Sequence, residues 1–241
     1  MIVEDDPELR AEMLGRIKSK FNLFNSRREG LHHSDLTYCI TKTYWKGNIG
    51  SKPTDHEALL FAVGLALEQV ILEDFDSNHR PPSVQVDGVW LSPDHVTLLS
   101  KGLTELKSSR ISIPKNELNP KNGWPEGWIK QMKGYKYAEL TGAFKDIVEP
   151  SDYYRIAAYL VIPAELHGRK FIFTNDELTE HWASIMENKW YLEQAQKQGV
   201  PPEPYAFVSS RKHDDWQCRN CSFQMHCSAT YSAGTFVRRT T

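Results

Sequence analysis

Hydrophobic residues recur at helical spacing in several segments of the chain. Between residues 55 and 75 the apolar positions fall three or four residues apart, at Leu59, Leu60, Val63, Leu67, Val70 and Ile71. This period predicts a buried helix over 55–75. Asp6 followed by Pro7 is typical of a helix start. The pattern predicts four further helices, over residues 7–28, 33–45, 128–140 and 176–198.

Residues 84–90 alternate between apolar and polar positions, which is typical of a β-strand. We expect this strand to form a three-strand meander with 96–99 and 103–107, in which the Ser-Pro-Asp sequence at 92–94 supplies a turn. The remaining predicted elements are strands over residues 153–162 and 169–174 and an exposed loop over 111–126.

The composition is that of an ordinary globular protein, with 40% hydrophobic and 25% charged residues in a chain of 241. This length suits one large core, so we expect a single domain over residues 1–241, with 1–33 as an N-terminal helical extension. No apolar run approaches the length of a membrane span, and the segment from Met1 to Asp6 lacks the basic and apolar regions of a secretory signal. We therefore expect a cytoplasmic protein without membrane contacts.

The formal charge of −2 gives no global attraction to a polyanion, so any contact with nucleic acid must rest on a local patch. Residues 101–145 hold nine Lys or Arg against four Glu. The candidate DNA-contacting side chains of this stretch are Lys130, Lys133, Lys136, Trp124 and Trp128. The alternative interpretations are a solvated mixed-charge face for the lysines and core packing for the tryptophans.

Three charged residues of the predicted meander form a candidate metal site. Residues two apart on a strand share a face, so Glu105 and Lys107 point the same way while Leu106 points into the core. Asp87 lies on the preceding strand and is expected to come alongside them. Two carboxylates suit Mg²⁺ or Mn²⁺, and the lysine can position water or stabilise charge on a phosphate. As a bare pattern this is weak, because most such triples are surface charges.

Two predicted helices add polar groups at matching spacing. Glu68 falls one turn after Gly64, which leaves space beside the carboxylate, so Glu68 is a candidate metal ligand or water anchor. An exposed helix carboxylate is the alternative. Gln131 and Tyr135 are likewise four residues apart on the next helix and share a face. Gln131 is a candidate for orienting the motif lysine or binding a phosphate, and Tyr135 for stacking on a base or contacting the DNA backbone.

Three of the four cysteines lie near the C-terminus, as Cys218-x-x-Cys221 and Cys227, and the fourth is Cys39. Disulfides are uncommon in cytosolic proteins, whereas thiolates at this spacing suit zinc or an iron–sulfur cluster. Cys39 would then tie the N-terminal region to the C-terminal region. Residue chemistry alone slightly favours zinc, because four-cysteine zinc sites are common, and free structural cysteines are a third interpretation.

Four motifs follow one another along the chain, namely Gly64-x-x-x-Glu68, Asp87, Glu105-Leu106-Lys107 and Gln131-x-x-x-Tyr135. This series resembles that of the RecB-type nucleases in the PD-(D/E)XK superfamily, and the resemblance extends over residues 34–230. The family usually has His in the first motif where this chain has Glu68, although related exonucleases use an acid there. The resemblance implies an α/β fold of the restriction-endonuclease type, with a mixed central sheet flanked by helices.

The same resemblance implies hydrolysis of DNA phosphodiester bonds with one or two Mg²⁺ or Mn²⁺ ions. The metal ligands that it implies are Glu68, Asp87, Glu105 and the backbone carbonyl of Leu106. Lys107 would assist the attacking water, with Gln131 and Tyr135 as further residues of the catalytic site.

The cysteine arrangement is similar to that of iron–sulfur nucleases, namely AddB-like proteins and the CRISPR-associated Cas exonucleases of the fourth kind. The similarity implies a [4Fe–4S] cluster rather than Zn²⁺, with Cys39 and residues 212–230 as an iron–sulfur module that joins the two ends of the domain. Its ligands would be Cys39, Cys218, Cys221 and Cys227.

This family likeness implies an exonuclease that acts on single-stranded DNA or single-stranded ends, in CRISPR adaptation or in phage or host recombination and repair. DNA is then the main partner, and other adaptation or recombination proteins or a second copy of the chain are further candidate partners. Two alternatives stay open, a non-catalytic DNA-binding scaffold subunit and a structure-specific endonuclease on the same fold.

Overall fold

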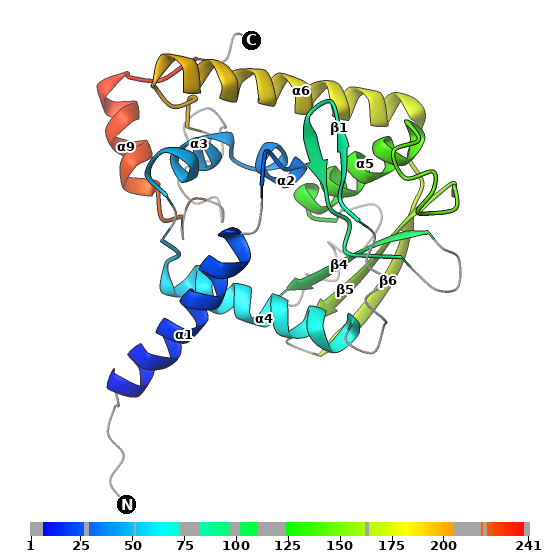
Figure 1. Cartoon of the computed structure of the whole chain (residues 1–241), viewed down its shortest axis with the longest axis horizontal. Coiled ribbons are helices and arrows are strands. Elements are labelled where there is room, and N and C mark those ends of the chain that lie inside the picture. The colour runs from blue at the N-terminus through cyan, green and yellow to red at the C-terminus, as the bar shows by residue number, and fades with distance from the viewer. Residues whose placement is uncertain are drawn as a thin grey trace, which may run out of the picture.

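The computed structural model describes residues 7–26, 29–50, 52–72, 82–96, 102–109, 124–161, 164–204, 218 and 221–238. Within these ranges the chain has a mixed α/β architecture, in which helices pack on both faces of a central sheet (Figure 1). The helices are α1 (Pro7–Ser26), α2 (His33–Thr37), α3 (Ile40–Ile49), α4 (Asp55–Leu72), α5 (Glu126–Leu140), α6 (Asn175–Gln198) and α9 (Gln224–Ala233). The strands are β1 (Val84–Val86), β2 (Val89–Leu91), β3 (His95–Val96), β4 (Leu103–Ser109), β5 (Tyr154–Leu160) and β6 (Glu165–Phe171).

The central sheet has the strand order β3-β4-β5-β6. β4 and β5 are parallel, whereas β3 pairs antiparallel with β4 and β6 pairs antiparallel with β5. α5 lies in the connection between β4 and β5, as parallel neighbours require a crossover segment. In the register Glu105 lies opposite Ile156 and Lys107 lies opposite Ala158. The mixed central sheet expected from the sequence is confirmed.

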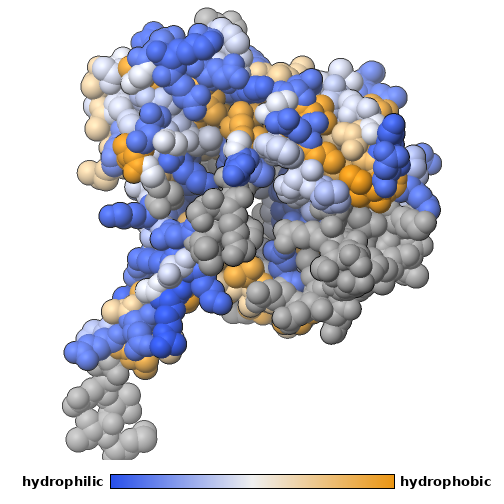
Figure 2. All heavy atoms as spheres, in the orientation of Figure 1, coloured by the Kyte–Doolittle hydropathy of each residue, from blue (hydrophilic) through white to orange (hydrophobic). Residues whose placement is uncertain are grey.

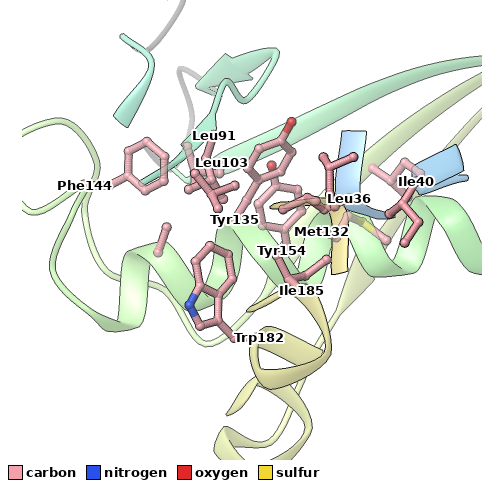
Figure 3. Packing of buried hydrophobic residues seen from close by; sticks show 14 of the residues in the cluster. Leu36, Ile40, Leu91, Leu103, Met132, Tyr135, Phe144, Tyr154, Trp182 and Ile185 are labelled. Atoms are coloured by element: carbon pink, nitrogen blue, oxygen red, sulfur yellow. The ribbon is translucent and has the colours of Figure 1, made fainter. Parts of the chain in front are cut away.

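One face of the sheet packs against α5 and carries the hydrophobic core. Every second residue of β5 is buried, from Tyr154 to Leu160, because alternate side chains of a strand point to opposite faces. Tyr154 stacks on Tyr135 of α5, with the ring centroids 5.9 Å apart. Figure 3 shows these two rings close to Leu103 of β4 and to Trp182 of α6. This packing fixes α5 against β5, the parallel neighbour of the strand that carries Glu105 and Lys107.

α4 covers one end of the opposite face. A Cβ atom placed on Gly64 would lie 3.7 Å from the Ser108 hydroxyl oxygen, so the helix approaches β4 closely there. α1 packs on α4, where the Phe21 and Phe61 rings meet edge to face with centroids 4.9 Å apart. Figure 1 shows α1 projecting away from the rest of the fold, and Figure 2 shows mainly hydrophilic residues along this projection.

α4 is less buried than its sequence pattern predicts. Ala58 is fully buried, but four large apolar side chains of the helix are between 41% and 72% exposed, namely Leu59, Leu60, Val63 and Val70. The expectation of a buried helix is therefore wrong for this segment. The physical reason is that α4 forms an outer layer of the fold, with β4 on one side and α1 packed along another.

The segment predicted as a single strand over 84–90 is a β-hairpin. β1 and β2 pair antiparallel with each other in a separate two-stranded sheet, so the first strand of the predicted meander is wrong, whereas the neighbouring pairing of β3 with β4 is antiparallel as a meander requires. The hairpin turns at Asp87 and Gly88, whose φ angles are 49° and 76°. Asp-Gly is a preferred sequence for a two-residue turn with two positive φ angles, and this local signal overrides the strand alternation.

The other predicted elements occur with shifted ends. The helix predicted over 33–45 is divided into α2 and α3. α6 begins after a capping box formed by Thr174 and Glu177 and ends at Gly199 in the left-handed conformation. Parts of the predicted elements lie outside the described residues, namely 27–28, 73–75, 97–99, 111–123 and 162. No helix in the described ranges is long and apolar enough to cross a bilayer.

Candidate functional site

Glu105 and Lys107 lie on the face of β4 that meets α5. The Glu105 side chain is 0% exposed and that of Lys107 is 17% exposed, and the two form an ion pair through Glu105 Oε1. Lys107 Nζ also donates a hydrogen bond of 2.8 Å to Gln131 Oε1 on α5. The structure therefore brings together the carboxylate, the ammonium group and the amide that the sequence placed in one site.

A chain of hydrogen bonds continues from Gln131 to the loop before β3. Gln131 Nε2 donates to Tyr135 Oη at 2.9 Å, and Tyr135 Oη donates to the Ser92 carbonyl at 3.0 Å. Tyr135 is only 4% exposed and stacks on Tyr154, so stacking of Tyr135 on a DNA base is not possible in this arrangement. The tyrosine instead fixes the orientation of the Gln131 amide that contacts Lys107.

Asp94, rather than Asp87, is the aspartate beside Glu105. Asp94 Oδ2 accepts a hydrogen bond of 3.0 Å from the backbone N–H of Leu106. Its carboxylate is close enough to Glu105 to raise the pKa of that group. Asp94 follows Pro93 directly before β3, where the sequence shows only turn chemistry. The Pro-Asp dipeptide eleven residues before Glu105 was the signal that sequence reasoning missed.

Asp87 lies elsewhere, in the turn of the β1–β2 hairpin. Its Oδ2 accepts a hydrogen bond of 2.8 Å from Trp182 Nε1, and its carbonyl accepts one of 2.6 Å from Lys189 Nζ. Both partners belong to α6. The expectation that Asp87 lies beside Glu105 and Lys107 is therefore wrong, because β1 and β2 pair in their own sheet. Asp87 anchors the hairpin to α6.

A pocket of about 320 Å³ opens where α4 faces the sheet beside Asp94 and Lys107. Its wall residues are Phe61, Gly64, Leu65, Leu67, Glu68, Asp94, Leu106, Lys107, Ser108 and Tyr159. Gly64 and Glu68 thus line one pocket, as their spacing suggests. Leu106 was expected to point into the core, but it lines this pocket because its face of β4 is the one turned toward α4. The carboxylate of Glu105 lies on the other face, near the core.

The charges of the site perturb one another strongly. Burial, together with the neighbouring Asp94 carboxylate, raises the pKa of Glu105 to about 8, although Lys107 acts in the opposite direction. Burial lowers the pKa of Lys107, but the nearby carboxylates of Glu105 and Asp94 outweigh it, so the lysine pKa lies above its ordinary value. Lys107 is therefore a fixed positive charge, and Glu105 is a carboxyl group held near its titration point.

The donor set fits a divalent cation of the hard, oxygen-seeking type. Glu105 Oε2 is buried and receives no hydrogen bond from the described residues, so a buried acceptor oxygen is left for a ligand. The Asp94 carboxylate is beside it, and Glu68 lines the same pocket. Within the described part of the chain no three acid, His or Cys side chains come together in metal-binding geometry. The oxygens of Asp94 and Glu105 are the ligands that Mg²⁺ and Mn²⁺ prefer.

No disulfide joins the four cysteines, which come from segments far apart in the sequence and lie near one another in the fold. Burial, with Cys39, Cys221 and Cys218 nearby, raises the pKa of the Cys227 thiol to about 12. Burial also raises the pKa of Cys221, and Cys39 adds to this increase. Cys39 precedes α3, and the other three lie in or just before α9. Residues 212–217 and 219–220 of the predicted iron–sulfur module lie outside the described residues.

The aromatic side chain of Trp45 lies beside the thiol of Cys227. The Trp45 indole nitrogen is buried and makes no geometrically satisfactory hydrogen bond to the described residues, yet it is close enough to Cys227 to lower the pKa of that thiol. The Trp45 ring lies 5.3 Å from the His226 ring, centroid to centroid. Tyr38 faces the Glu105 and Lys107 pair instead of the cysteines. The thiols lie near one another without meeting in metal-binding geometry among the described residues, and thiolates are the ligands that zinc and iron–sulfur clusters use.

The lysines and tryptophans proposed for DNA contact do not form an open basic face. Each lysine lies within ion-pair distance of a glutamate, and the pairs are Lys130 with Glu126 at 2.7 Å, Lys133 with Glu177 at 3.6 Å and Lys136 with Glu139 at 2.7 Å. Trp124 is 6% exposed and meets Phe171 edge to face, and Trp128 packs against the core. The structure thus shows mixed charge around the lysines and core packing of the tryptophans, and contact of these residues with DNA stays a prediction.

The comparisons with known proteins give a shared fold and no family. No protein-family model and no curated protein matches the sequence. The crystal structure of SSO0001 matches with a TM-score of 0.53 and 17% identity, over 91% of this chain and 96% of that chain. An alkaline exonuclease (LHK-Exo) from Laribacter hongkongensis matches with a TM-score of 0.41 and 12% identity, over 73% of this chain and 96% of that chain. The chain thus has the fold of SSO0001.

Proposed function

We propose that the chain is a Mg²⁺- or Mn²⁺-dependent deoxyribonuclease that acts as an exonuclease on single-stranded DNA or single-stranded ends. The observation that carries this proposal is the group of Asp94, Glu105 and Lys107, in which two carboxylates and a lysine meet beside a pocket. One buried oxygen of Glu105 receives no hydrogen bond from the part of the chain that the structure describes. The order of these residues in PD-(D/E)XK nucleases supports the same activity, with Asp94 in the place first assigned to Asp87.

In the proposed reaction the acidic residues bind the metal ion and Lys107 supplies a positive charge. Asp94 and Glu105 would hold the cation. Glu68 and the Leu106 carbonyl are proposed as further oxygen ligands, because Glu68 and Leu106 line the pocket together with Asp94. The bound cation supplies Lewis-acid stabilisation of the phosphate and of the attacking water. Lys107 keeps its charge and donates a hydrogen bond to the Gln131 amide. Because Lys107 also lines the pocket, it can orient water and balance negative charge on the phosphate.

The four cysteines are proposed to hold a [4Fe–4S] cluster, with Zn²⁺ as the alternative. Support comes from the mutual approach of Cys39, Cys218, Cys221 and Cys227 and from the Trp45 indole N–H close to Cys227. The cluster would join α3 to α9 and so support the fold rather than enter the reaction. A role in CRISPR adaptation or in recombination and repair follows from the family resemblance alone.

Substitution of the two aspartates separates this proposal from the assignment made on the sequence. Asp94→Asn and Lys107→Met are expected to lower Mn²⁺-dependent degradation of single-stranded DNA by about 100-fold or more, because each removes several kcal/mol of charge stabilisation. Asp87→Asn is the matched control, since its carboxylate bonds to Trp182 outside the pocket. It should lower the melting temperature while the folded protein keeps its activity.

The measurement is the rate of release of acid-soluble nucleotides at saturating Mn²⁺, with circular dichroism to check folding. Loss of activity in Asp87→Asn but not in Asp94→Asn contradicts the site as described. A circular single-stranded substrate distinguishes the two modes of cleavage, because an exonuclease cannot begin on it.

A further inference from the structure

The sheet face opposite the core is partly open beside the pocket. Tyr159 of β5 lines the pocket under α4, and Ala157, two residues earlier in the chain, lies on the same face of the strand. The register partner of Ala157 is Gly168 of β6, where an added Cβ would meet no atom within 4 Å. Leu166, the partner of Tyr159, is 67% exposed. Small residues therefore leave a smooth strip that runs away from the pocket along β5 and β6.

Arg155 and Lys170 stand at the far end of this strip. They are register partners on β5 and β6, so their side chains share one face, the same face as Tyr159. Both pack on the ring of Tyr153, with Arg155 Cζ 5.0 Å and Lys170 Nζ 4.4 Å from its centroid. Arg155 Nη2 also donates a hydrogen bond of 3.0 Å to Tyr153 Oη. The aromatic ring thus holds two positive groups close together.

The charge at this position differs from that of the α5 lysines. Lys170 takes part in none of the ion pairs formed within the described ranges, whereas Lys130, Lys133 and Lys136 each lie beside a glutamate. The side chain of Arg169, one residue before Lys170, points to the opposite face of β6, because its register partner is the core residue Ile156. The pair of cations is therefore specific to the face that carries the pocket.

The distance between the pocket and the pair of Arg155 and Lys170 suits a polymeric anion. Tyr159 and Arg155 are four residues apart on β5, which is roughly 13 Å along an extended strand. Stacked DNA advances about 3.4 Å per nucleotide, so this length corresponds to roughly four nucleotides. A ligand that reaches both places must carry a negative charge several bonds away from the reacting group, as a nucleic-acid strand does.

We propose that Arg155 and Lys170, held by Tyr153, bind the phosphate backbone of a single DNA strand that lies on the open strip of β5 and β6 and enters the pocket at Tyr159. The proposal rests on the deoxyribonuclease function proposed above and names the surface that guides its substrate. Phosphate contacts of this kind fix the position of a strand without selecting its sequence.

The salt dependence of DNA binding tests this surface. A fluorescent 12-nucleotide single strand is titrated with the full-length protein in EDTA, so that no cleavage occurs, at several KCl concentrations. The logarithm of the association constant falls linearly with the logarithm of the salt concentration. Each lost phosphate contact makes this slope less steep by about 0.7 for single strands. The slope of the Arg155→Gln/Lys170→Gln variant should therefore be less steep than that of the wild type by about 1.4. The slope of Lys170→Gln alone, at an exposed residue, should be less steep by about 0.7.

Arg169→Gln is the matched control, because it removes the same charge from the same strand on the other face. The proposal is overturned if the salt dependence of binding by Lys170→Gln equals that of Arg169→Gln. Because Lys170 is exposed, its replacement by glutamine should not prevent folding. Cleavage is measured separately with Mn²⁺ and wild-type protein. Binding that depends on Lys170 without any cleavage would refute the nuclease function and leave the strand-binding surface in place.

Discussion

Gly134 of α5 lies against the His33 ring, and its replacement by alanine is expected to destabilise the fold. A Cβ atom at this position would lie 2.2 Å from His33 Nε2 and 2.4 Å from its Cε1. Restoring an ordinary contact distance requires a displacement of about 1 Å. Because Gly134 lies between Gln131 and Tyr135 on α5, a shift here also moves the residues that orient Lys107.

The ring of His33 has little freedom to move aside. It is 1% exposed, lies parallel to the Trp182 ring within 7°, and its Nε2 is 3.1 Å from His181 Nε2. Overpacking of a buried site costs about 1–3 kcal/mol, and a lost hydrogen bond costs about 1 kcal/mol more. Alanine recovers about 1 kcal/mol through its higher helix propensity. The expected net loss in the free energy of unfolding is about 1–3 kcal/mol.

Thermal and urea denaturation measure this loss. For a chain of this size 1 kcal/mol corresponds to roughly 2–4 °C in melting temperature. Gly47→Ala in α3 is the control, because an added Cβ meets nothing within 4 Å there. His33→Ala should relieve the clash, so the double variant should lose less than the sum of the two single variants. The steric argument is refuted if Gly134→Ala is as stable as Gly47→Ala, or if the effects of His33→Ala and Gly134→Ala simply add.

Three further predictions concern titration and the cysteines. Burial raises the pKa of Glu105 from 4.5 to about 8, so the folded metal-free protein binds more protons than the unfolded chain between these values and loses stability as pH rises through them. Glu105→Gln should flatten this part of the stability profile measured by urea denaturation in EDTA, and an unchanged profile contradicts the assignment. Burial lowers the pKa of His33 to about 3 and that of His181 to about 4, so stability is lost as pH falls from 6.5 toward these values. His181→Gln should show a shallower acid limb, whereas an equally steep limb would mean that other groups cause it. Cys218→Ser should abolish the visible absorption of anaerobically purified protein and lower its thermal stability, and a colourless wild type with stoichiometric zinc would show that the centre is not iron–sulfur.

The parts of the site that lie within one element could be predicted from the sequence. Glu105 and Lys107 share a strand face because side chains alternate, and Gln131 and Tyr135 share a helix face because they are four residues apart. These relations need no knowledge of the rest of the fold. The contact of Lys107 with Gln131 then follows once α5 packs on that face of β4.

The identity of the aspartate could not be predicted in the same way. Which of Asp87 and Asp94 reaches Glu105 depends on which strand pairs with β4, and this is a contact between segments distant in sequence. The alternation of residues 84–90 favoured one long strand, although Asp87-Gly88 already carried the signal for a hairpin. The short strand β3, with Asp94 just before it, has too few residues for its periodicity to be recognised.

The charges of α5 show a second limit of local reasoning. Lys130 and Lys136 have their partners on the same helix, where the spacing of three or four residues was visible. The partner of Lys133 is Glu177 on α6, which no local pattern reveals. The cationic pair of Arg155 and Lys170 comes from two strands whose register is set by the whole sheet.

Asp94 is held by a hydrogen bond from the main-chain N–H of Leu106. Every amino acid except proline offers that N–H group, so the position of Asp94 is independent of which side chain residue 106 carries. Residue 106 also forms part of the pocket wall. Position 106 is thus a place where natural variation or engineering can reshape the cavity, and with it the choice of substrate, while the acidic pair stays in register.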